Sequence, residues 1–126
     1  MNEDRKIILA VDDTPMQLHA LIKILQPLYA VKIAKSGEAG IEFAMNNKID
    51  LIMLDVIMPG MSGLEVLEIL KQEEKTKNIP VVLATGNTSE DDKKNGMDKG
   101  ASDYIEKPFD HNIVHDCISR LLSVNI

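Results

Sequence analysis

LIMLDVIMPGMSG, residues 51–63, joins a short apolar run to an acidic residue, Asp55. The same arrangement occurs once more, because residues 7–11, IILAV, are followed directly by Asp12 and Asp13. Both runs have the length and composition of buried strands. In an open parallel sheet, ligands bind at the carboxyl ends of the strands. The position of these carboxylates therefore predicts a binding site at one edge of a sheet.

Five short apolar runs alternate with segments of helical periodicity along the chain. The runs are residues 7–11, 30–34, 51–54, 81–84 and 103–105. Between them, apolar residues recur at the spacing of a helix face: Leu18, Leu21, Ile22, Leu25 and Leu28; Ile41, Phe43 and Ala44; Leu64, Val66, Leu67, Ile69 and Leu70; Val114, Cys117, Ile118, Leu121 and Leu122. The alternation predicts a three-layer α/β fold, a parallel sheet covered by helices on both faces with right-handed crossovers.

The fourth helical segment, residues 89–100, is the weakest of the set. It is dominated by charged residues and offers little beyond Met97 and Ala101 for burial, and Gly96 is expected to interrupt it. Glycine lowers helix stability, and a helix with few apolar contacts opens easily. We therefore predict that this segment is the most mobile helix.

Length and composition describe one globular domain, residues 1–126. A hydrophobic content of 44% is enough for a core without disulfides or structural metals, and Cys117 is the only cysteine. A net charge of -6 disfavours direct nucleic-acid binding, which needs a basic face. The charged N-terminal stretch is followed by no long apolar segment. We expect a soluble cytoplasmic domain without a membrane anchor.

Three neighbouring carboxylates are costly unless a cation accompanies them. Two unit charges about 5 Å apart repel by about 3 kcal/mol at an effective dielectric constant of roughly 20. Oxygen ligands without a Cys or His cluster favour a hard ion, and a site with few carboxylates suits Mg²⁺ better than Ca²⁺. We therefore predict a Mg²⁺ site at Asp12, Asp13 and Asp55 that Mn²⁺ can also fill.

A purely structural role remains open for each aspartate taken singly. Aspartate after a strand is a common turn former, and Asp13 or Thr14 could cap a helix that begins at Pro15. The combination is more informative, because Lys107 and Thr85 follow the fifth and fourth runs and should reach the same edge of the sheet. An ammonium and a hydroxyl would then face the carboxylates.

These residues together resemble the receiver domain of two-component response regulators, over essentially the whole chain. The resemblance rests on the acidic pair Asp12 and Asp13, on Asp55 with the following turn Val56 to Gly63, and on Thr85, Tyr104, Lys107 and Pro108. It implies a flavodoxin-like (βα)5 fold with strand order 2-1-3-4-5. It also implies that Asp55 accepts a phosphoryl group from a histidine kinase or a histidine phosphotransferase.

The resemblance assigns a role to each residue of the expected site. Asp13 and Asp55 would hold Mg²⁺ together with the Ile57 backbone carbonyl, and Asp12 would act through water. Lys107 and Thr85 would bind the phosphoryl oxygens.

The resemblance further implies a switch that reaches the protein surface. Thr85 and Tyr104 would move on phosphorylation, and the Lys107-Pro108 peptide bond would be cis. The altered surface, formed by the fourth helix, fifth strand and fifth helix, would contact a downstream protein or a fused effector domain. The resemblance also implies a monomer or a phosphorylation-dependent dimer that would catalyse only its own phosphorylation and dephosphorylation.

Two other phosphate-related functions fit the same residues poorly. A haloacid-dehalogenase-like phosphatase needs a second aspartate two positions after the first, where this chain has Ile57. In a flavodoxin-like FMN site, Asp12 and Asp13 would repel the phosphate group of the cofactor. A receiver-like module that binds partners without phosphorylation remains the main alternative.

Ile57 and Asn87 would flank the route by which water attacks a phosphorylated Asp55. Because an apolar Ile57 offers this water no base, we predict slow dephosphorylation.

Two histidines stand outside this site. His111 and His115 have the i, i+4 spacing that can hold a metal on one helix face. Solvated helix histidines are far commoner, so the spacing alone does not assign them a function.

Overall fold

The structure is a computed structural model that describes residues 5–86 and 90–123. Strands and helices alternate through these residues: β1 Ile7–Val11, α1 Pro15–Leu25, β2 Ala30–Ala34, α2 Gly37–Asn46, β3 Leu51–Asp55, α3 Gly63–Gln72, β4 Val81–Thr85, α4 Glu90–Asp98, β5 Asp103–Glu106 and α5 His111–Ser123. Each strand lies within one residue of the run that predicted it. The α/β alternation expected from the sequence is confirmed.

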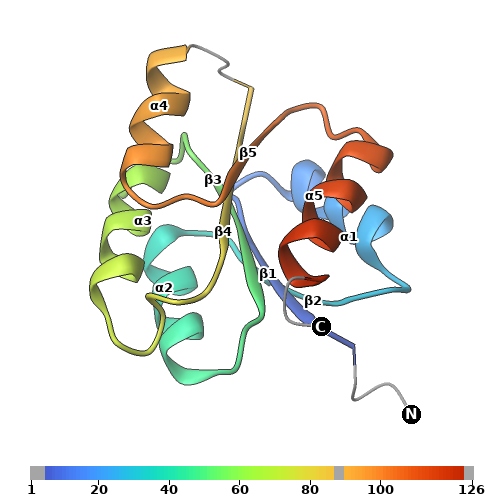
Figure 1. The fold of residues 1–126 in the computed structure, drawn as a ribbon, viewed down its shortest axis with the longest axis horizontal. Coiled ribbons are helices and arrows are strands. Elements are labelled where there is room, and N and C mark those ends of the chain that lie inside the picture. Colours follow the sequence, from blue (N-terminus) through green and yellow to red (C-terminus); the bar gives the residue numbers. More distant parts are fainter. Residues whose placement is uncertain (1–4, 87–89, 124–126) are drawn as a thin grey trace.

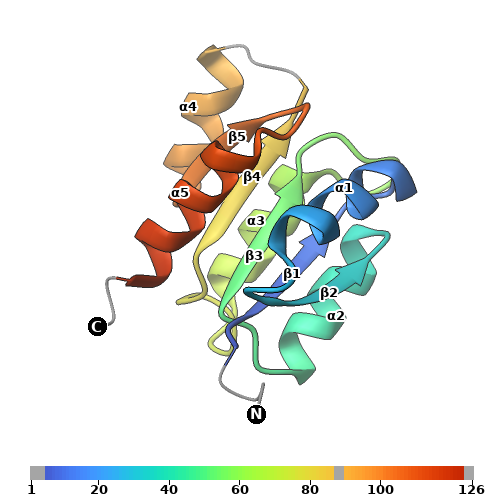
Figure 2. The ribbon, with the colours of Figure 1, turned by 90° about the vertical axis from the view of Figure 1, so that its right-hand side faces the viewer.

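The five strands form one parallel sheet in the order β2-β1-β3-β4-β5, as the resemblance implied. The helices α1 and α5 cover one face of this sheet, and α2, α3 and α4 cover the other (Figure 1). Figure 2 shows the same layers from the side of α1 and α5. The fold is therefore the doubly wound flavodoxin-like arrangement, which places the ends of β1 and β3 side by side.

Two apolar clusters fill the layers on either side of the sheet. Alternate residues of β1 separate between them: Leu9 and Val11 pack with α2 and α3, whereas Ile8 and Ala10 pack with α1 and α5. Every residue of the central strands β3 and β4 is buried. This two-sided burial explains why the strands read as continuous apolar runs rather than alternating ones.

Local signals fix where the helices begin. Ser62 and Glu65 form a reciprocal capping box at the start of α3. Pro15 occupies the first turn of α1, and Thr14 is its N-cap residue without a side-chain cap bond. Asp12 instead accepts a hydrogen bond from the Thr14 backbone N–H at 2.9 Å. Thr14, not Asp13, therefore occupies the N-cap position, but its side chain makes no capping hydrogen bond.

Three details of the helices differ from the sequence expectation. Leu28 lies beyond α1, which ends at Leu25, and it is 60% exposed rather than part of the apolar face. Met97 is 45% exposed. Gly96 lies inside α4 and is buried against Leu83, so a close approach of the helix to β4 explains the glycine rather than an interruption. Ser89 lies outside the described residues.

No helix in the described part of the chain is both long and apolar enough to span a bilayer.

Cys117 is buried on the inner side of α5. Burial, followed by the charge of Asp103, raises the pKa of its thiol to about 12. Because the thiolate is the reactive form, we expect the folded protein to resist iodoacetamide at about pH 8 while the urea-unfolded chain reacts freely. Mass spectrometry over a labelling time course measures both rates. Equal rates in the two states would contradict this expectation.

Candidate phosphoryl and metal site

The three aspartates converge at the carboxyl edge of the sheet. Asp12 follows β1, Asp55 ends β3, and the two strands pair in register up to Val11 and Leu54. One carboxylate oxygen from each of Asp12, Asp13 and Asp55 lies within 4.8 Å of the others. Asp12 and Asp55 are only 2% and 5% exposed, whereas Asp13 is exposed. The predicted cluster therefore opens to solvent on the side of Asp13.

Lys107 brings a positive charge into this cluster. Its Nζ lies 2.8 Å from Asp12 Oδ2 and 3.2 Å from Asp55 Oδ1. The segment after β5 is tied to β4, since the Lys107 backbone N–H donates to the Thr85 carbonyl oxygen at 3.0 Å. The Lys107-Pro108 peptide bond is cis, as predicted. Sequence reasoning placed Lys107 at this edge but missed its direct ion pair with Asp12.

The pKa of Asp55 is raised above its ordinary value. Burial is the main cause and the neighbouring Asp12 charge is the second, while Lys107 and the Ile57 backbone act in the opposite direction. The Lys107 charge therefore does not fully offset the effect of burial on Asp55. A further cation at the cluster would favour the ionised form of Asp55.

The remaining predicted residues that the structure describes differ in their exposure. Thr85, at the end of β4, is 1% exposed. Tyr104, on β5, is half-buried, and the Lys93 ammonium lies 5.5 Å from the centre of its ring. The Ile57 side chain is 62% exposed beside the site. Asn87 lies outside the described residues.

The turn after β3 is built around a close backbone approach. Gly60 has a positive φ of 75°, which favours glycine. The Gly63 N–H then donates to the Val56 carbonyl oxygen at 2.8 Å. A Cβ at Gly63 would lie 2.1 Å from the Asp55 carbonyl oxygen. The resemblance included Gly63 only as the end of the turn after Asp55, because a glycine in the sequence does not reveal which backbone atoms it must contact.

The donors present fit a hard divalent cation. All three side chains of the cluster offer carboxylate oxygens, which are ligands that Mg²⁺ prefers. Burial and the neighbouring Asp12 charge raise the pKa of Asp55, and a bound cation would counter both effects. The acidic cluster can therefore bind a metal ion.

Replacing Lys107 with methionine should make the fold more dependent on a cation. We expect the metal-free protein to lose about 2 kcal/mol, less than a fully buried pair would cost, because the cluster opens to solvent at Asp13. Mg²⁺ should then raise the thermal midpoint of Lys107→Met more than that of the wild type. Differential scanning calorimetry with and without Mg²⁺ measures both effects. Equal Mg²⁺ responses would show that Lys107 does not neutralise the cluster.

Comparison with curated proteins finds relatives of several lengths. PilH of Pseudomonas aeruginosa is 33% identical over 117 residues, which cover 92% of this chain and 97% of PilH. A probable cyclic di-GMP phosphodiesterase of Vibrio cholerae is 40% identical over 101 residues. That match covers 80% of this chain but 23% of the relative.

Solved structures share the fold over nearly the whole chain. Chemotaxis protein CheY4 of Vibrio cholerae has a TM-score of 0.88 and 29% identity, with 94% of this chain and 99% of CheY4 covered. The receiver domain of sensor histidine kinase PA1611 from Pseudomonas aeruginosa has a TM-score of 0.87. The match covers 94% of this chain and 98% of that domain at 24% identity, which supports a common fold alone. That domain was solved with a magnesium ion in its active site cleft.

The family model of the response regulator receiver domain matches residues 8–119. This range contains every strand residue except Ile7, together with the acidic cluster and Lys107. The chain therefore belongs to the response regulator receiver domain family.

Proposed function

We propose that Asp55 accepts a phosphoryl group from a histidine kinase or a histidine phosphotransferase in a Mg²⁺-dependent reaction. The observation that carries this proposal is the environment of Asp55. Its buried carboxylate lies at a strand end, 3.2 Å from the Lys107 ammonium and within 4.8 Å of oxygens from Asp12 and Asp13. As a receiver domain of two-component signalling, the chain is not an enzyme in the usual sense.

The chemistry needs a nucleophile and neutralisation of the phosphoryl charge. An oxygen of Asp55 attacks phosphorus, and the bond from phosphorus to the donor histidine nitrogen breaks. Asp12, Asp13, Asp55 and the Ile57 carbonyl would hold Mg²⁺, or Mn²⁺ in its place. The bound ion would offset negative charge on the phosphoryl oxygens. Lys107 and Thr85 would bind those oxygens, for which Lys107 leaves its present carboxylate partners.

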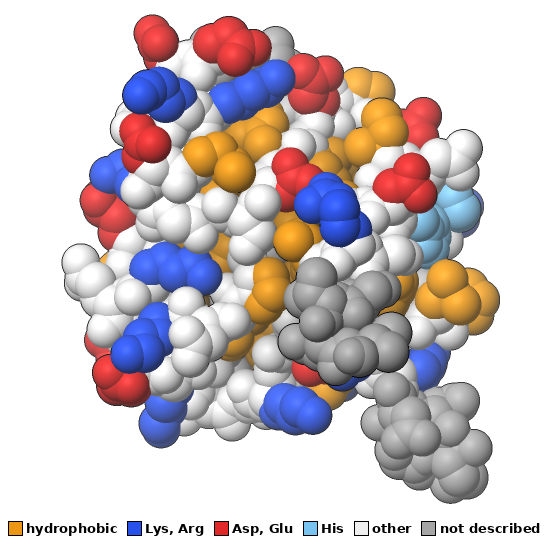
Figure 3. Space-filling model, viewed as in Figure 1, with side chains coloured by type: hydrophobic (Ala, Val, Ile, Leu, Met, Phe, Trp, Pro, Cys, Tyr) orange, Lys and Arg blue, Asp and Glu red, His pale blue; other side chains and the backbone are white. Residues whose placement is uncertain are grey.

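The signal would leave the site through β4 and β5. Thr85 and Tyr104 are the proposed switch residues, and the Lys107 N–H already ties β5 to the Thr85 carbonyl. A cavity of about 330 Å³ beside Tyr104 is also lined by Lys93 and Ile113, so it is bounded by α4, β5 and α5. Acidic and basic side chains alternate around α4 at the upper left of Figure 3. A change at Tyr104 would therefore alter a surface that a partner can contact.

The α4, β5 and α5 surface would contact either a separate downstream protein or a fused effector domain. The chain covers nearly all of PilH but about a quarter of the phosphodiesterase, so both a free-standing domain and a fused effector are consistent with the relatives. We assign residues 1–126 to one receiver domain that acts as a monomer or a phosphorylation-dependent dimer. A reducing cytoplasm suits its single cysteine.

Incubation with Mg²⁺ and acetyl phosphate tests the proposed function. We expect intact-mass spectrometry to detect one added phosphoryl group, and none when EDTA removes the metal. Beryllofluoride with Mg²⁺ should shift the amide NMR signals of residues around Asp55 and Tyr104. A protein that gains no phosphoryl group and shows no beryllofluoride response would instead be a binding module that works without phosphorylation.

Ile57 should slow the loss of the phosphoryl group. Its apolar side chain is 62% exposed beside Asp55 and provides no base for an attacking water. We expect Ile57→Glu to shorten the phosphoryl half-life by about tenfold, within the usual range for a positioned base. Mass spectrometry after removal of acetyl phosphate measures the decay, with Ile57→Leu as the apolar control. An Ile57→Glu half-life equal to the wild-type value would remove this role, and an unchanged half-life in Asn87→Ala would do the same for Asn87.

A further inference from the structure

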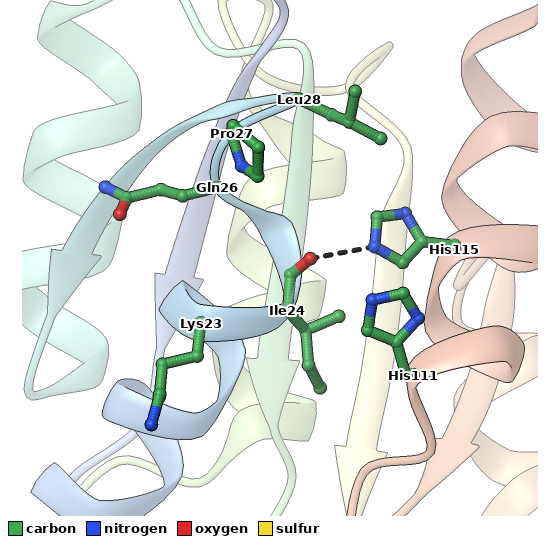
Figure 4. A pocket seen from close by; sticks show the side chains of 7 residues that line it. All are labelled: Lys23, Ile24, Gln26, Pro27, Leu28, His111 and His115. Atoms are coloured by element: carbon green, nitrogen blue, oxygen red, sulfur yellow. Dashed lines mark hydrogen bonds between the residues drawn. The ribbon is translucent and has the colours of Figure 1, made fainter.

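A cavity of about 380 Å³ lies between the end of α1 and the first turns of α5. Its lining includes His111 and His115 from α5 and Ile24, Pro27 and Leu28 from the end of α1 and the residues that follow. Figure 4 shows both imidazole rings on the side of α5 that faces α1. None of the residues of the acidic cluster lines this cavity, so it is chemically separate from the proposed phosphorylation site.

The two histidines already lie in contact. They are four residues apart on one helix, and their ring centroids are 4.4 Å apart with an angle of 41° between the rings. In Figure 4 each ring turns one nitrogen toward α1. Rings this close can each provide a nitrogen to one metal ion, because such bonds are about 2 Å long. Bringing the ligands together would therefore require little rearrangement.

His115 is fixed by contacts on more than one side. Its Nε2 lies 2.8 Å from the Ile24 carbonyl oxygen, and its ring stacks on Tyr29 with centroids 6.2 Å apart. A carbonyl oxygen only accepts, so Nε2 carries a proton in this contact. Two ligands bound to one tetrahedral ion, with bonds of about 2.1 Å, lie about 3.4 Å apart. A metal ion can therefore take the place of this proton with a small change in spacing.

The Ile24 carbonyl is well placed to attract a cation. It lies in the last turn of α1, where carbonyl groups lack intrahelical partners and carry the negative end of the helix dipole. The backbone N–H groups of Leu28 and Tyr29 donate to the Leu25 oxygen instead. The Ile24 oxygen thus contacts α5 through the His115 ring.

We propose that His111 and His115, with the Ile24 carbonyl oxygen, form a second metal site for a divalent ion of the Zn²⁺, Ni²⁺ and Cu²⁺ group. Imidazole nitrogens prefer these ions, whereas Mg²⁺ prefers the carboxylate oxygens of the other site. Lys23 also lines the cavity, and its positive charge opposes a cation. The affinity is therefore lower than that of a closed site with four protein ligands. Binding would link α1 to α5.

Zinc titration of the full chain in excess Mg²⁺ tests the second site. Mg²⁺ occupies the carboxylates, so calorimetry should report one Zn²⁺ bound elsewhere. His111→Gln and His115→Gln should each weaken binding by about tenfold or more, because each loses one of two nitrogen ligands. His19→Gln is the matched control, since His19 is exposed on α1 and does not line the cavity. Its affinity should equal that of the wild type.

Two further measurements separate ligation from a structural role. Zn²⁺ should raise the thermal midpoint of the wild type more than that of His111→Gln. His111 is exposed at the start of α5, so its replacement should leave the fold intact. The electron paramagnetic resonance spectrum of bound Cu²⁺ should show nitrogen coupling that both variants reduce. Equal zinc affinity in the wild type and both variants overturns the proposal, as does loss of all zinc binding when Mg²⁺ is added. Acetyl phosphate labelling should be unchanged in these variants, so the two sites can fail independently.

Discussion

Replacing Asp55 with asparagine is expected to abolish phosphoryl transfer to the domain. The amide has nearly the shape of the carboxylate but lacks the nucleophilic oxygen that, in the proposed function, would attack phosphorus. Wild-type protein with acetyl phosphate and Mg²⁺ should gain one phosphoryl group by intact mass, while Asp55→Asn should gain none. Beryllofluoride should likewise leave the NMR spectrum of the variant unchanged.

The fold should survive this substitution. The pKa of Asp55 is raised by burial and by the Asp12 charge, which shows that the ionised form is destabilised where it lies. Its neutral replacement removes this repulsion, so urea unfolding should report a stability equal to or above that of the metal-free wild type. Asp98→Asn, on the exposed face of α4, is the control and should label normally. Equal labelling of wild type and Asp55→Asn would place the acceptor elsewhere.

The difference in stability between Asp55→Asn and the wild type should depend on pH in a defined direction. Because the folded pKa of Asp55 is raised, the folded state binds its proton more readily than the unfolded chain does. The carboxylate therefore reduces stability above its ordinary pKa, and the reduction is complete above the raised value. The stability advantage of Asp55→Asn should accordingly be present at neutral pH and shrink as the pH falls through that range.

The central strands could be predicted closely because burial on both faces leaves an unbroken apolar pattern. The runs that became β3 and β4 are apolar without interruption, and a parallel sheet is the common setting for such strands. The convergence of Asp12 and Asp55 followed, since neighbouring parallel strands end at the same edge. This step needed the strand order, which came from the resemblance rather than from the apolar pattern.

The errors arose where tertiary contacts override helical periodicity. Leu28 continues the apolar spacing of α1, but the chain leaves the helix after Leu25. Gly96 looks like a helix breaker, yet α4 packs so closely on Leu83 that a larger residue would collide with it. The direct contact of Lys107 with Asp12 was also missed, because it spans 95 residues and depends on the path after β5.

Replacing Gly63 with alanine is expected to cost more than about 3 kcal/mol, at or beyond the upper end of ordinary overpacking. The added Cβ would lie 2.1 Å from the Asp55 carbonyl oxygen and 2.7 Å from the Val56 Cα. Both are backbone atoms, so no side-chain rotation can relieve the collision. The hydrogen bond from the Gly63 N–H to the Val56 carbonyl, 2.8 Å long, would be strained as the segments separate. Urea unfolding followed by circular dichroism measures the loss.

Gly86→Ala is the matched control for this substitution. Gly86 directly follows Thr85, and a Cβ there would meet nothing within 4 Å. Its stability should therefore stay within about 0.5 kcal/mol of the wild-type value. In Gly63→Ala, the backbone that collides belongs to Asp55, the proposed phosphoacceptor, so the surviving folded fraction should also label more slowly with acetyl phosphate. If Gly63→Ala and Gly86→Ala unfold at the same urea concentration, the start of α3 is looser than the structure shows. A close contact there would then no longer explain how the turn after β3 holds Asp55 in place.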